Sequence, residues 1–361
     1  MVDSLPNVRA VFLTQTGPEG ASARYRVYAY LPYLERAGIE TVVWPLPPPA
    51  SGGKITYYAG SFLRRWQQAG RARGFDVAVL QRDLINHLRP VLEKRLFRAG
   101  VPILLDVDDA IHLRPPGRPA GFLARAFGSA DKLADLVPLA RCVLAGNEEL
   151  LRVCRERGAR RVRLLPTAID FSRIGPLPKE RAPGNPFVLG WIGSPGTVPY
   201  LEAIRPALED LGRKGGFLLR VVGAKAPAFK SLATESLPWS LENENTLVEG
   251  FDAGLMPLSD DPWSRAKCGT KLLQYMALGV PAVASPVGAN LAIVDPRPGA
   301  TGAGLLASHP QEWVAALEHL RADPQLRAQL RAQGRSRVEG HYNVESLAPD
   351  LIEEIRQAAR T

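Results

Sequence analysis

The sequence has few of the features that define secreted, disulfide-bonded or membrane-spanning proteins. Its 361 residues include three cysteines, Cys142, Cys154 and Cys268, which are odd in number and widely spaced. This usage fits a reducing compartment and a protein without a metal framework. No apolar run reaches 18 residues, and no charged-then-apolar leader begins the chain. We therefore expect a cytoplasmic protein without spanning segments.

Excess positive charge is confined to the first half of the chain. Residues 1–180 hold 27 Lys and Arg against 17 Asp and Glu, whereas residues 181–361 hold 18 against 19. Such asymmetry indicates an acidic partner, such as a membrane surface, a lipid phosphate or an acidic glycan. An arginine-rich proteome would explain the same numbers. Nucleic acid is not expected, because no module of stacking aromatic residues accompanies the charge.

Alternating apolar and amphipathic segments predict two α/β domains, which the length also favours. Predicted strands are Val8–Thr14, Thr41–Trp44, Val77–Leu80, Ile103–Val107, Cys142–Ala145, Val162–Leu165, Phe187–Ile192, Phe217–Val222 and Ala253–Met256. Predicted helices include Leu84–Ala99, Pro199–Arg213 and Val344–Ala359. The stretch Arg173–Pro186 holds four prolines and two glycines and reads as a linker. The predicted division is 1–172, a linker at 173–186, 187–340, and a C-terminal helix at 341–361.

The segment from Asp260 to Ala289 carries the strongest functional signal. Gly269 and Thr270 stand where a helix would begin, and Lys271 lies in its first turn. A helix N-terminus attracts anions through free N–H groups and its partial positive charge. Three cations gather at this end: Arg265, Lys267 and Lys271. Cations there are unfavourable unless an anion lies among them, so the pattern predicts a diphosphate site.

The run from Lys271 to Ala284, KLLQYMALGVPAVA, resembles the "KxxEYMAxGxPVVA" stretch of GT-B glycosyltransferases of family 4 (glycosyl transferases group 1). The resemblance implies two Rossmann-like, doubly wound parallel-sheet domains facing a cleft, with the last helix crossing back to the first domain. It also implies a nucleotide-sugar donor, an acceptor hydroxyl, and a retaining mechanism without a metal or other cofactor. The acceptor, whether a lipid carrier, a glycan or a small molecule, is not specified.

The sequence departs from the family pattern at two places. Relatives carry a basic pair after the first strand of the second domain, where this chain has Gly193 and Ser194. Aligning the acidic Glu-x7-Glu pair gives Ala266 and Gln274. Gln274 could still bond ribose hydroxyls, and backbone amides near Cys268 could replace the missing acid. These departures leave open a catalytically weakened GT-B protein that binds carbohydrate or an acidic polymer. A nicotinamide enzyme is disfavoured, because no Gly-x-Gly-x-x-Gly follows either first strand.

Two further groups of residues are candidates in the first domain. Asp108 and Asp109 follow a predicted strand where relatives carry His-Asp, so Asp108 is a catalytic candidate that would contact a sugar or acceptor hydroxyl or act as general base. Asp109 and His112 would support it. Asp106 and Asp108 also spell Asp-x-Asp, a metal-binding motif in the other glycosyltransferase fold, and helix capping is a further use of these carboxylates.

The remaining candidates lie where the family has its first Gly-rich loop: Gly20, Ala21, Ser22, Arg24 and Arg26. The three small residues would allow close approach to phosphate or acceptor, and the two arginines would hold an anion or stay solvated. The segment Ile55–Gly74 mixes aromatic residues with Arg64, Arg65, Arg71 and Arg73. It reads either as a helix on an anionic membrane surface, at the cytoplasmic face, or as a sheet-covering helix with a basic outer side.

Overall fold

The computed structural model describes residues 8–48, 53–86, 88–114, 127–177, 185–295 and 302–360. Their contacts divide the chain into two compact units. The first unit comprises Met1–Thr167, Ala266–Cys268 and Val344–Thr361, and the second comprises Ala168–Arg265 and Gly269–Asn343. Half of the predicted linker, residues 178–184, lies outside the described residues. Within the described ranges, no helix is long and apolar enough to cross a bilayer.

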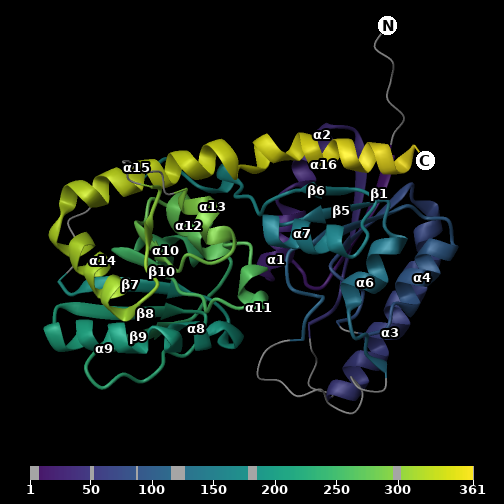
Figure 1. The fold of residues 1–361 in the computed structure, drawn as a ribbon. Coiled ribbons are helices and arrows are strands. Elements are labelled where there is room, and N and C mark those ends of the chain that lie inside the picture. The colour runs from purple at the N-terminus through teal and green to yellow at the C-terminus, as the bar shows by residue number, and fades with distance from the viewer. Residues whose placement is uncertain are drawn as a thin grey trace, which may run out of the picture. The chain divides into compact units, whose positions relative to one another are not determined.

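The first unit is built on a six-stranded parallel sheet in the order β2-β1-β3-β4-β5-β6 (Figure 1). The strands are β1 (Val8–Thr14), β2 (Ile39–Pro45), β3 (Val77–Gln81), β4 (Ile103–Val107), β5 (Cys142–Ala145) and β6 (Val162–Leu164). After β2 the chain returns to the other side of β1, so the strand order reverses between β1 and β3. Ligands of open α/β sheets bind beyond the carboxyl ends of the strands at such a reversal.

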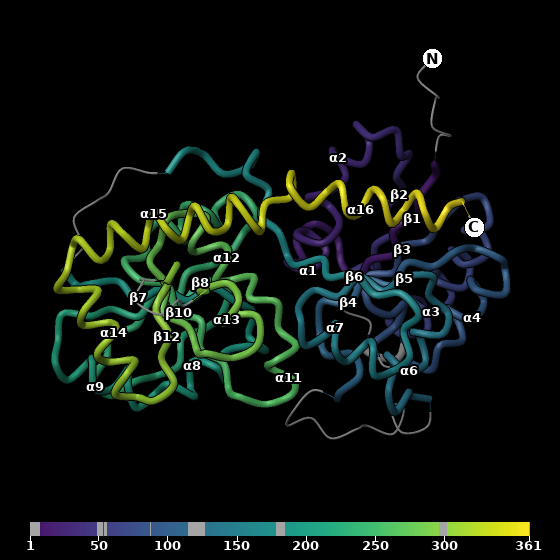
Figure 2. The backbone as a smooth tube through the Cα atoms, turned by 45° about the horizontal axis from the view of Figure 1, so that its top comes forward, coloured from purple at the N-terminus to yellow at the C-terminus, as the bar shows by residue number. Residues whose placement is uncertain are grey.

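Helices α1 (Ala21–Ala23), α2 (Leu31–Arg36), α3 (Lys54–Arg71), α4 (Val91–Arg98), α6 (Lys132–Leu136) and α7 (Glu148–Glu156) belong to this unit. A π-helical turn, Arg24–Tyr28, follows α1. The C-terminal helix α16 (Val344–Ala359) packs on α2 and on the first sheet (Figure 2). Its Arg356 donates to Ala37 O at 2.6 Å, and its buried Glu354 accepts from Arg161 at 2.8 Å.

The second unit repeats this plan with a parallel sheet in the order β12-β11-β10-β7-β8-β9. Its strands are β7 (Phe187–Ile192), β8 (Phe217–Val222), β9 (Ala233–Leu237), β10 (Ala253–Met256), β11 (Ala282–Ala284) and β12 (Leu305–Leu306). Its helices are α8 (Pro199–Ala203), α9 (Arg205–Lys214), α10 (Glu244–Glu249), α11 (Pro262–Arg265), α12 (Thr270–Ala277), α13 (Ala289–Val294), α14 (Pro310–Ala322) and α15 (Pro324–His341). Here the order reverses between β7 and β10.

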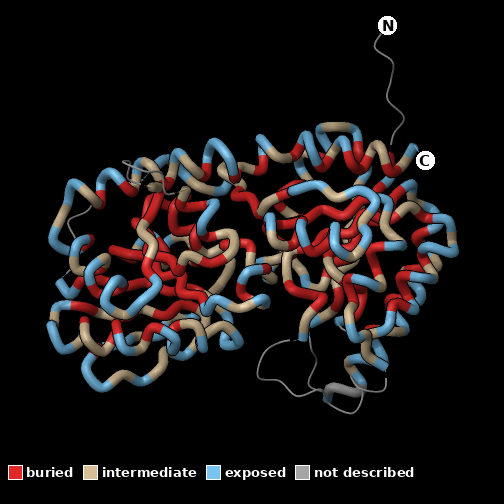
Figure 3. Tube along the Cα trace, in the orientation of Figure 1, coloured by how far each residue is buried: buried red, intermediate tan, exposed pale blue. Residues whose placement is uncertain are grey.

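Burial follows the sheets in each unit, where buried residues line the strands and exposed residues the outer faces of the helices (Figure 3). The strand β7 is buried along its whole length, as its unbroken apolar run predicts. In the second unit Trp191 and Trp313 anchor a core cluster between the sheet and α9 and α14. The predicted fold class, two doubly wound parallel-sheet units, is confirmed.

Three local predictions were wrong or incomplete. The predicted helix Leu84–Ala99 begins only at Val91, because Pro90 disfavours helical backbone in the residue before it. The predicted helix Pro199–Arg213 is interrupted at Ile204, and Pro206 stands in the first turn of the second piece. The edge strand Ala233–Leu237 was missed, since its sequence, ATESL, lacks an apolar run.

Candidate functional site

In the second unit, the predicted site lies at the strand reversal between β7 and β10. Helix α12 begins at Thr270, as its sequence predicts. The hydroxyl of the buried Tyr275 accepts from Ile192 N at 3.1 Å and donates to Leu255 O at 3.3 Å. These two bonds attach α12 to both strands that flank the reversal. The N-terminus of the helix is thereby fixed beside the end of β7.

Lys271 lies across the end of β7. Its Nζ is 5.4 Å from the ring centroid of Trp191, a cation–π distance. A Cβ atom added at Gly193 would lie 2.8 Å from Lys271 Cε and 2.6 Å from the Trp191 ring. Glycine at 193 is therefore required for this placement of the lysine. The structure thus brings Lys271 and Gly193 together at the end of β7.

Helix α12 also positions its N-cap residue Gly269 and, in its second turn, Gln274. Gly269 has φ of 67°, and a Cβ there would meet Ile293 Cδ1 at 2.3 Å, so this helix entry needs glycine. The side chain of Gln274 is buried, and its Nε2 has no hydrogen-bond partner among the described residues. A buried unpaired amide is costly, which favours a ligand group as its partner.

The other predicted residues of this segment have more varied surroundings. Arg265 is exposed and forms a two-bond ion pair with Asp260, at 2.6 and 3.1 Å. Ser194 is exposed and Thr270 half-buried. Lys267 and Cys268 group with the first unit, where Lys267 O accepts from Asn147 Nδ2 at 3.0 Å.

In the first unit, polar side chains gather beyond the carboxyl ends of β1, β3 and β4. Arg26 is buried in a two-bond ion pair with Asp106 and also donates to Leu165 O. Burial opposes the charge of Arg26, but Asp106 raises the pKa of the guanidinium above its ordinary value. The predicted use of Arg26 as an anion ligand is therefore wrong. The ion pair with Arg26 occupies both carboxylate oxygens of Asp106, the first residue of the Asp-x-Asp motif. Among the described residues, no three acidic, histidine or cysteine side chains could hold a metal ion.

Asp108 is held by a hydrogen-bond chain that runs from the end of β3 through helix α1. Ser22 Oγ donates to Asp108 Oδ2, and Gln81 Nε2 donates to Ser22 Oγ at 2.5 Å. Cys268 Sγ donates to Asp108 O at 3.3 Å. Ser22 therefore hydrogen-bonds the candidate carboxylate. The sequence had suggested only that this small residue leaves room for a phosphate or an acceptor. Its neighbours Gly20 and Ala21 form the turn that enters α1.

Asp109 lies beside two cations. Its Oδ1 accepts from Lys267 Nζ at 2.7 Å and from Ala110 N at 2.9 Å. Burial would raise the pKa of Asp109, but Lys267 and Arg82 hold it below its ordinary value. Lys267 is therefore a counter-ion of Asp109, a role that the sequence did not predict.

Arg82 is the residue of this cluster that sequence reasoning missed. Its Nε lies 3.3 Å from Asp108 Oδ1, and its Nη1 lies 3.5 Å from Asp109 Oδ2. The available signal was a charged pair, Arg82-Asp83, directly after an apolar strand. From the sequence, the acidic pair at 108–109 was singled out. Arg82 received no weight, because none of the family motifs considered there includes an arginine after β3.

The last two candidates are buried. His112 is buried, its Nδ1 has no partner among the described residues, and burial together with Arg157 lowers its pKa. Both effects favour the neutral imidazole. Arg24 is buried, and its Nη1 donates to Pro18 O at 3.1 Å and Glu19 O at 3.3 Å, which braces the turn before α1.

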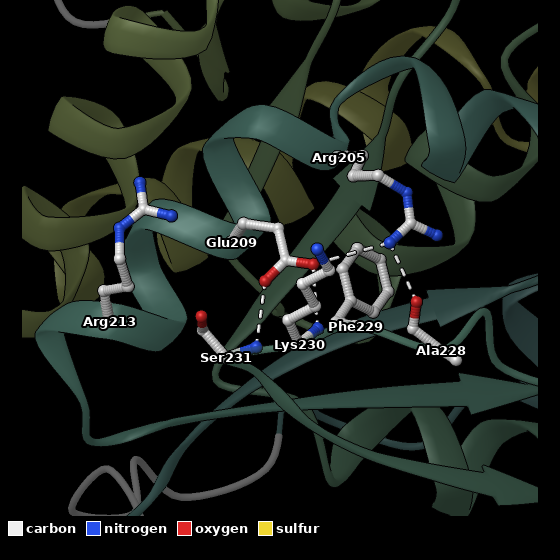
Figure 4. Close-up of a pocket in the computed structure, with 7 residues that line it drawn as sticks. All are labelled: Arg205, Glu209, Arg213, Ala228, Phe229, Lys230 and Ser231. Atoms are coloured by element: carbon white, nitrogen blue, oxygen red, sulfur yellow. Dashed lines mark hydrogen bonds and ion pairs between the residues drawn. The ribbon is translucent and has the colours of Figure 1, made fainter.

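The second unit also has a surface hollow of about 580 Å³, away from the predicted residues (Figure 4). It is lined by Arg205, Glu209, Arg213, Ala228, Phe229, Lys230 and Ser231. Glu209 accepts from Lys230 N and Ser231 N at 2.9 Å, and Arg205 donates to Ala228 O at 2.8 Å. These bonds fasten α9 to the chain entering β9, which indicates a structural role.

Comparison with known proteins bears on both units. Residues 193–323 match the family described as Glycosyl transferases group 1. HepE from Anabaena in complex with UDP and glucose superposes with TM-score 0.66 at 17% identity, covering 97% of this chain and 100% of that chain. Sucrose-phosphate synthase from Thermosynechococcus elongatus gives TM-score 0.70 at 15% identity, with 97% and 98% covered. The E. coli trehalose-6-phosphate structure bound with UDP-2-fluoro glucose gives 0.63 at 13%, with 97% and 99% covered.

No curated protein sequence matches the chain. The solved structures share its two-sheet architecture, and the family match falls on the segment that carries Gly193, Gly269, Lys271 and Gln274. The chain therefore has the GT-B fold, and its residues 193–323 form a domain of the glycosyl transferases group 1 family.

Proposed function

We propose that this protein transfers a hexose from a UDP-sugar to an acceptor hydroxyl. The observation that carries the proposal is the pairing of Lys271 with the N-terminus of α12 beside Gly193, at the strand reversal of the second unit. Such a site suits a diphosphate. The choice of uridine is supported by HepE, whose structures contain UDP and UDP-glucose, and by the E. coli structure bound with UDP-2-fluoro glucose.

The proposed reaction breaks the bond between the sugar anomeric carbon and the diphosphate oxygen. The acceptor hydroxyl oxygen forms the new bond to that carbon, and its proton passes to the leaving diphosphate. The products are UDP and the glycosylated acceptor, with the anomeric configuration retained. Lys271 and the α12 amides stabilise the charge that develops on the departing diphosphate. The buried Nε2 of Gln274, which has no partner among the described residues, would donate to a ribose hydroxyl.

On the acceptor side, Asp108 is proposed to bind a sugar or acceptor hydroxyl. Its carboxylate is oriented by Ser22 and accompanied by Asp109. A carboxylate fixed by neighbouring donors is a good hydrogen-bond acceptor for such a hydroxyl. The buried His112 is proposed to support, in its neutral form, the turn that follows Asp109. Backbone amides near Cys268 and Gly269 are proposed to replace the absent acid at position 266.

We further propose that the enzyme works at the cytoplasmic face of an anionic membrane, on a lipid-linked or otherwise anionic acceptor. The outer faces of α3 and α4 support this proposal. They expose Leu63 (59%), Trp66 (38%) and Phe97 (51%). Exposed cations accompany them: Arg64, Arg71, Lys94 and Arg98. The α3 sequence contains no acid, and the acid of α4, Glu93, is buried against Lys132.

The structure corrects the composition of this surface. Arg65, predicted to belong to it, is fully buried and donates to Thr14 O at 2.6 Å and Trp44 O at 2.8 Å. Arg95 lies between the two helices, 4.1 Å from the Trp66 ring centroid. That contact joins the exposed residues of α3 to those of α4. Apolar side chains within a basic surface are typical of interfacial binding.

The donor proposal is tested by thermal shift with UDP, GDP, ADP and dTDP. UDP should raise the melting temperature most, since a ligand stabilises the state that binds it. UDP-glucose should then release UDP in the presence of an acceptor. Stabilisation by UDP without any release would favour the alternative, a binding module with weakened catalysis. Preference for another nucleotide would overturn the choice of uridine.

The membrane proposal is tested by flotation with vesicles of anionic or neutral lipid. Binding should require anionic lipid and fall as salt rises, because the charges are screened within a Debye length of about 8 Å at physiological salt. Leu63→Ser with Phe97→Ser should weaken it. Leu291→Ser, at an exposed apolar residue of the second unit, is the matched control. Equal binding to both vesicle types, or none, contradicts the proposal.

A further inference from the structure

Arg82 has a backbone conformation that its side chain disfavours. Its φ is 64°, in the left-handed region, and among the described residues only Asp295 shares this feature outside glycine. Such conformations persist where the surroundings enforce them, and they cluster at functional sites. Here the enforcing bond is Arg82 N to Asp106 O at 2.7 Å, directly after β3. The side chain thus turns toward the ends of β3 and β4.

This turn places the guanidinium against two carboxylates. Its nitrogens lie 3.3 Å from Asp108 and 3.5 Å from Asp109, while Lys267 reaches only Asp109. Two neighbouring carboxylates repel each other, so a cation beside both helps to hold them close together. Asp106 and Asp83 are the other acids near Arg82, and Arg26 pairs with Asp106. Among the residues that the structure describes, Arg82 is therefore the cation that contacts Asp108.

We propose that Arg82 is a positioning residue that holds Asp108 in the orientation needed to accept a hydrogen bond from a sugar or acceptor hydroxyl. Ser22 holds one carboxylate oxygen of Asp108, and Arg82 lies beside the other. The carboxylate keeps little rotational freedom. This inference rests on the proposed function for the identity of the hydroxyl. The contact between Arg82 and Asp108 is independent of which hydroxyl binds there.

The first test is kinetic and compares Arg82→Ala, Arg82→Lys and Asp108→Asn. Arg82→Ala should lower kcat on the order of 10²-fold, with the UDP dissociation constant within about twofold of wild type. Arg82→Lys should restore part of the loss, because it keeps the charge but not the planar fork. Adding Asp108→Asn to Arg82→Ala should cost little more, since both act through one group. Arg141→Ala, at an exposed arginine of the same unit, is the control.

The second test needs no substrate. Crystal structures should show the Asp108 carboxylate displaced from Ser22 Oγ in Arg82→Ala and in place in Arg141→Ala. Unchanged turnover with an undisplaced carboxylate overturns the proposal. Loss of UDP affinity together with a lower melting temperature in Arg82→Lys would show a purely structural role and also overturns it. A wild-type protein that fails to bind UDP refutes the donor proposal alone, because the position of the Asp108 carboxylate still decides the role of Arg82.

Discussion

The ammonium group of Lys271 lies 5.4 Å from the centre of the Trp191 ring, in the space that only a glycine at 193 leaves open. The indole is buried at the end of β7, so it also orients the lysine. The helix that carries Lys271 is attached to the same strand by Tyr275. The charge is thus fixed before any ligand arrives, which is the arrangement that electrostatic stabilisation of a leaving group requires.

Lys271→Ala should lower turnover by about 10²–10³-fold, the usual cost of removing one preorganised charge. UDP binding should weaken as well, because the diphosphate loses its cation, while the fold stays intact. Calorimetric titration with UDP and initial rates with UDP-glucose measure the two effects. Lys214→Ala is the matched control, since Lys214 is exposed at the end of α9 and forms an ion pair with Glu318. Wild-type UDP affinity in Lys271→Ala would refute the assignment.

Gly193→Ala should also weaken UDP binding, although it removes no charge. The new methyl group would lie 2.8 Å from Lys271 Cε and would displace the lysine from Trp191. Gly196→Ala is the control, because a Cβ at that position meets no heavy atom within 4 Å. The two variants are compared by UDP titration and thermal unfolding. Equal affinity in both would show that the placement of Lys271 is not critical.

Much of the fold could be predicted from the sequence, because parallel strands buried on both faces leave unbroken apolar runs. The strands β1, β4, β5, β7, β8 and β10 match their predicted bounds. The start of α12 was predicted from Gly269 and Lys271, whose types are constrained by local backbone and charge. The edge strand β9 was missed because it is exposed and mostly polar. Local pattern thus succeeds where burial is complete.

The first-unit cluster could be predicted only in part. Asp108 and Asp109 stood out as acids after a strand, but their counter-ions come from distant positions. Lys267 is 158 residues from Asp109 in sequence, and Arg82 depends on a left-handed backbone that no local motif signals. The basic residues Arg26 and Arg65 appeared available for anions, yet both are buried against acceptors. Which charged residues pair depends on the tertiary structure, so it could not be predicted from local sequence patterns.

Arg65→Ala should destabilise the protein strongly, whereas Arg64→Ala should not. Arg65 is fully buried and donates to three backbone carbonyls, those of Thr14, Trp44 and Leu84. Each buried acceptor left unsatisfied costs about 1–3 kcal/mol. The exposed neighbour Arg64 should change the free energy of unfolding by less than about 0.5 kcal/mol. Urea unfolding of both variants measures the contrast, and equal effects would contradict it.

Activity should survive a chelator, because protein cations and helix amides serve the diphosphate. Asp106 of the Asp-x-Asp motif is paired with Arg26. Asp106→Asn should therefore lower stability by about 3–5 kcal/mol, the cost of leaving a buried charge unpaired. Rates are measured with EDTA and after adding back Mn²⁺ or Mg²⁺. Loss of turnover with EDTA and its return with metal would make Asp106 and Asp108 metal ligands.

Asp109→Asn should change stability in a pH-dependent way. Although burial opposes it, Lys267 and Arg82 hold the pKa of Asp109 below its ordinary value, which is about 3.9 in an unfolded chain. The unfolded state therefore binds the proton more readily, so ionised Asp109 stabilises the folded state above about pH 4. That contribution is lost as the pH falls through the lower pKa of the folded state.

The free energies of unfolding of wild type and Asp109→Asn should accordingly differ at pH 7 and converge as the pH falls below about 4. Urea unfolding across this range measures the difference. Asp210→Asn, at a side chain that is 40% exposed on α9, should stay within about 0.5 kcal/mol of wild type throughout. A difference between wild type and Asp109→Asn that is constant with pH would mean that lost hydrogen bonds, rather than the charge of Asp109, account for it. In that case Lys267 would not act as the counter-ion that its 2.7 Å contact indicates.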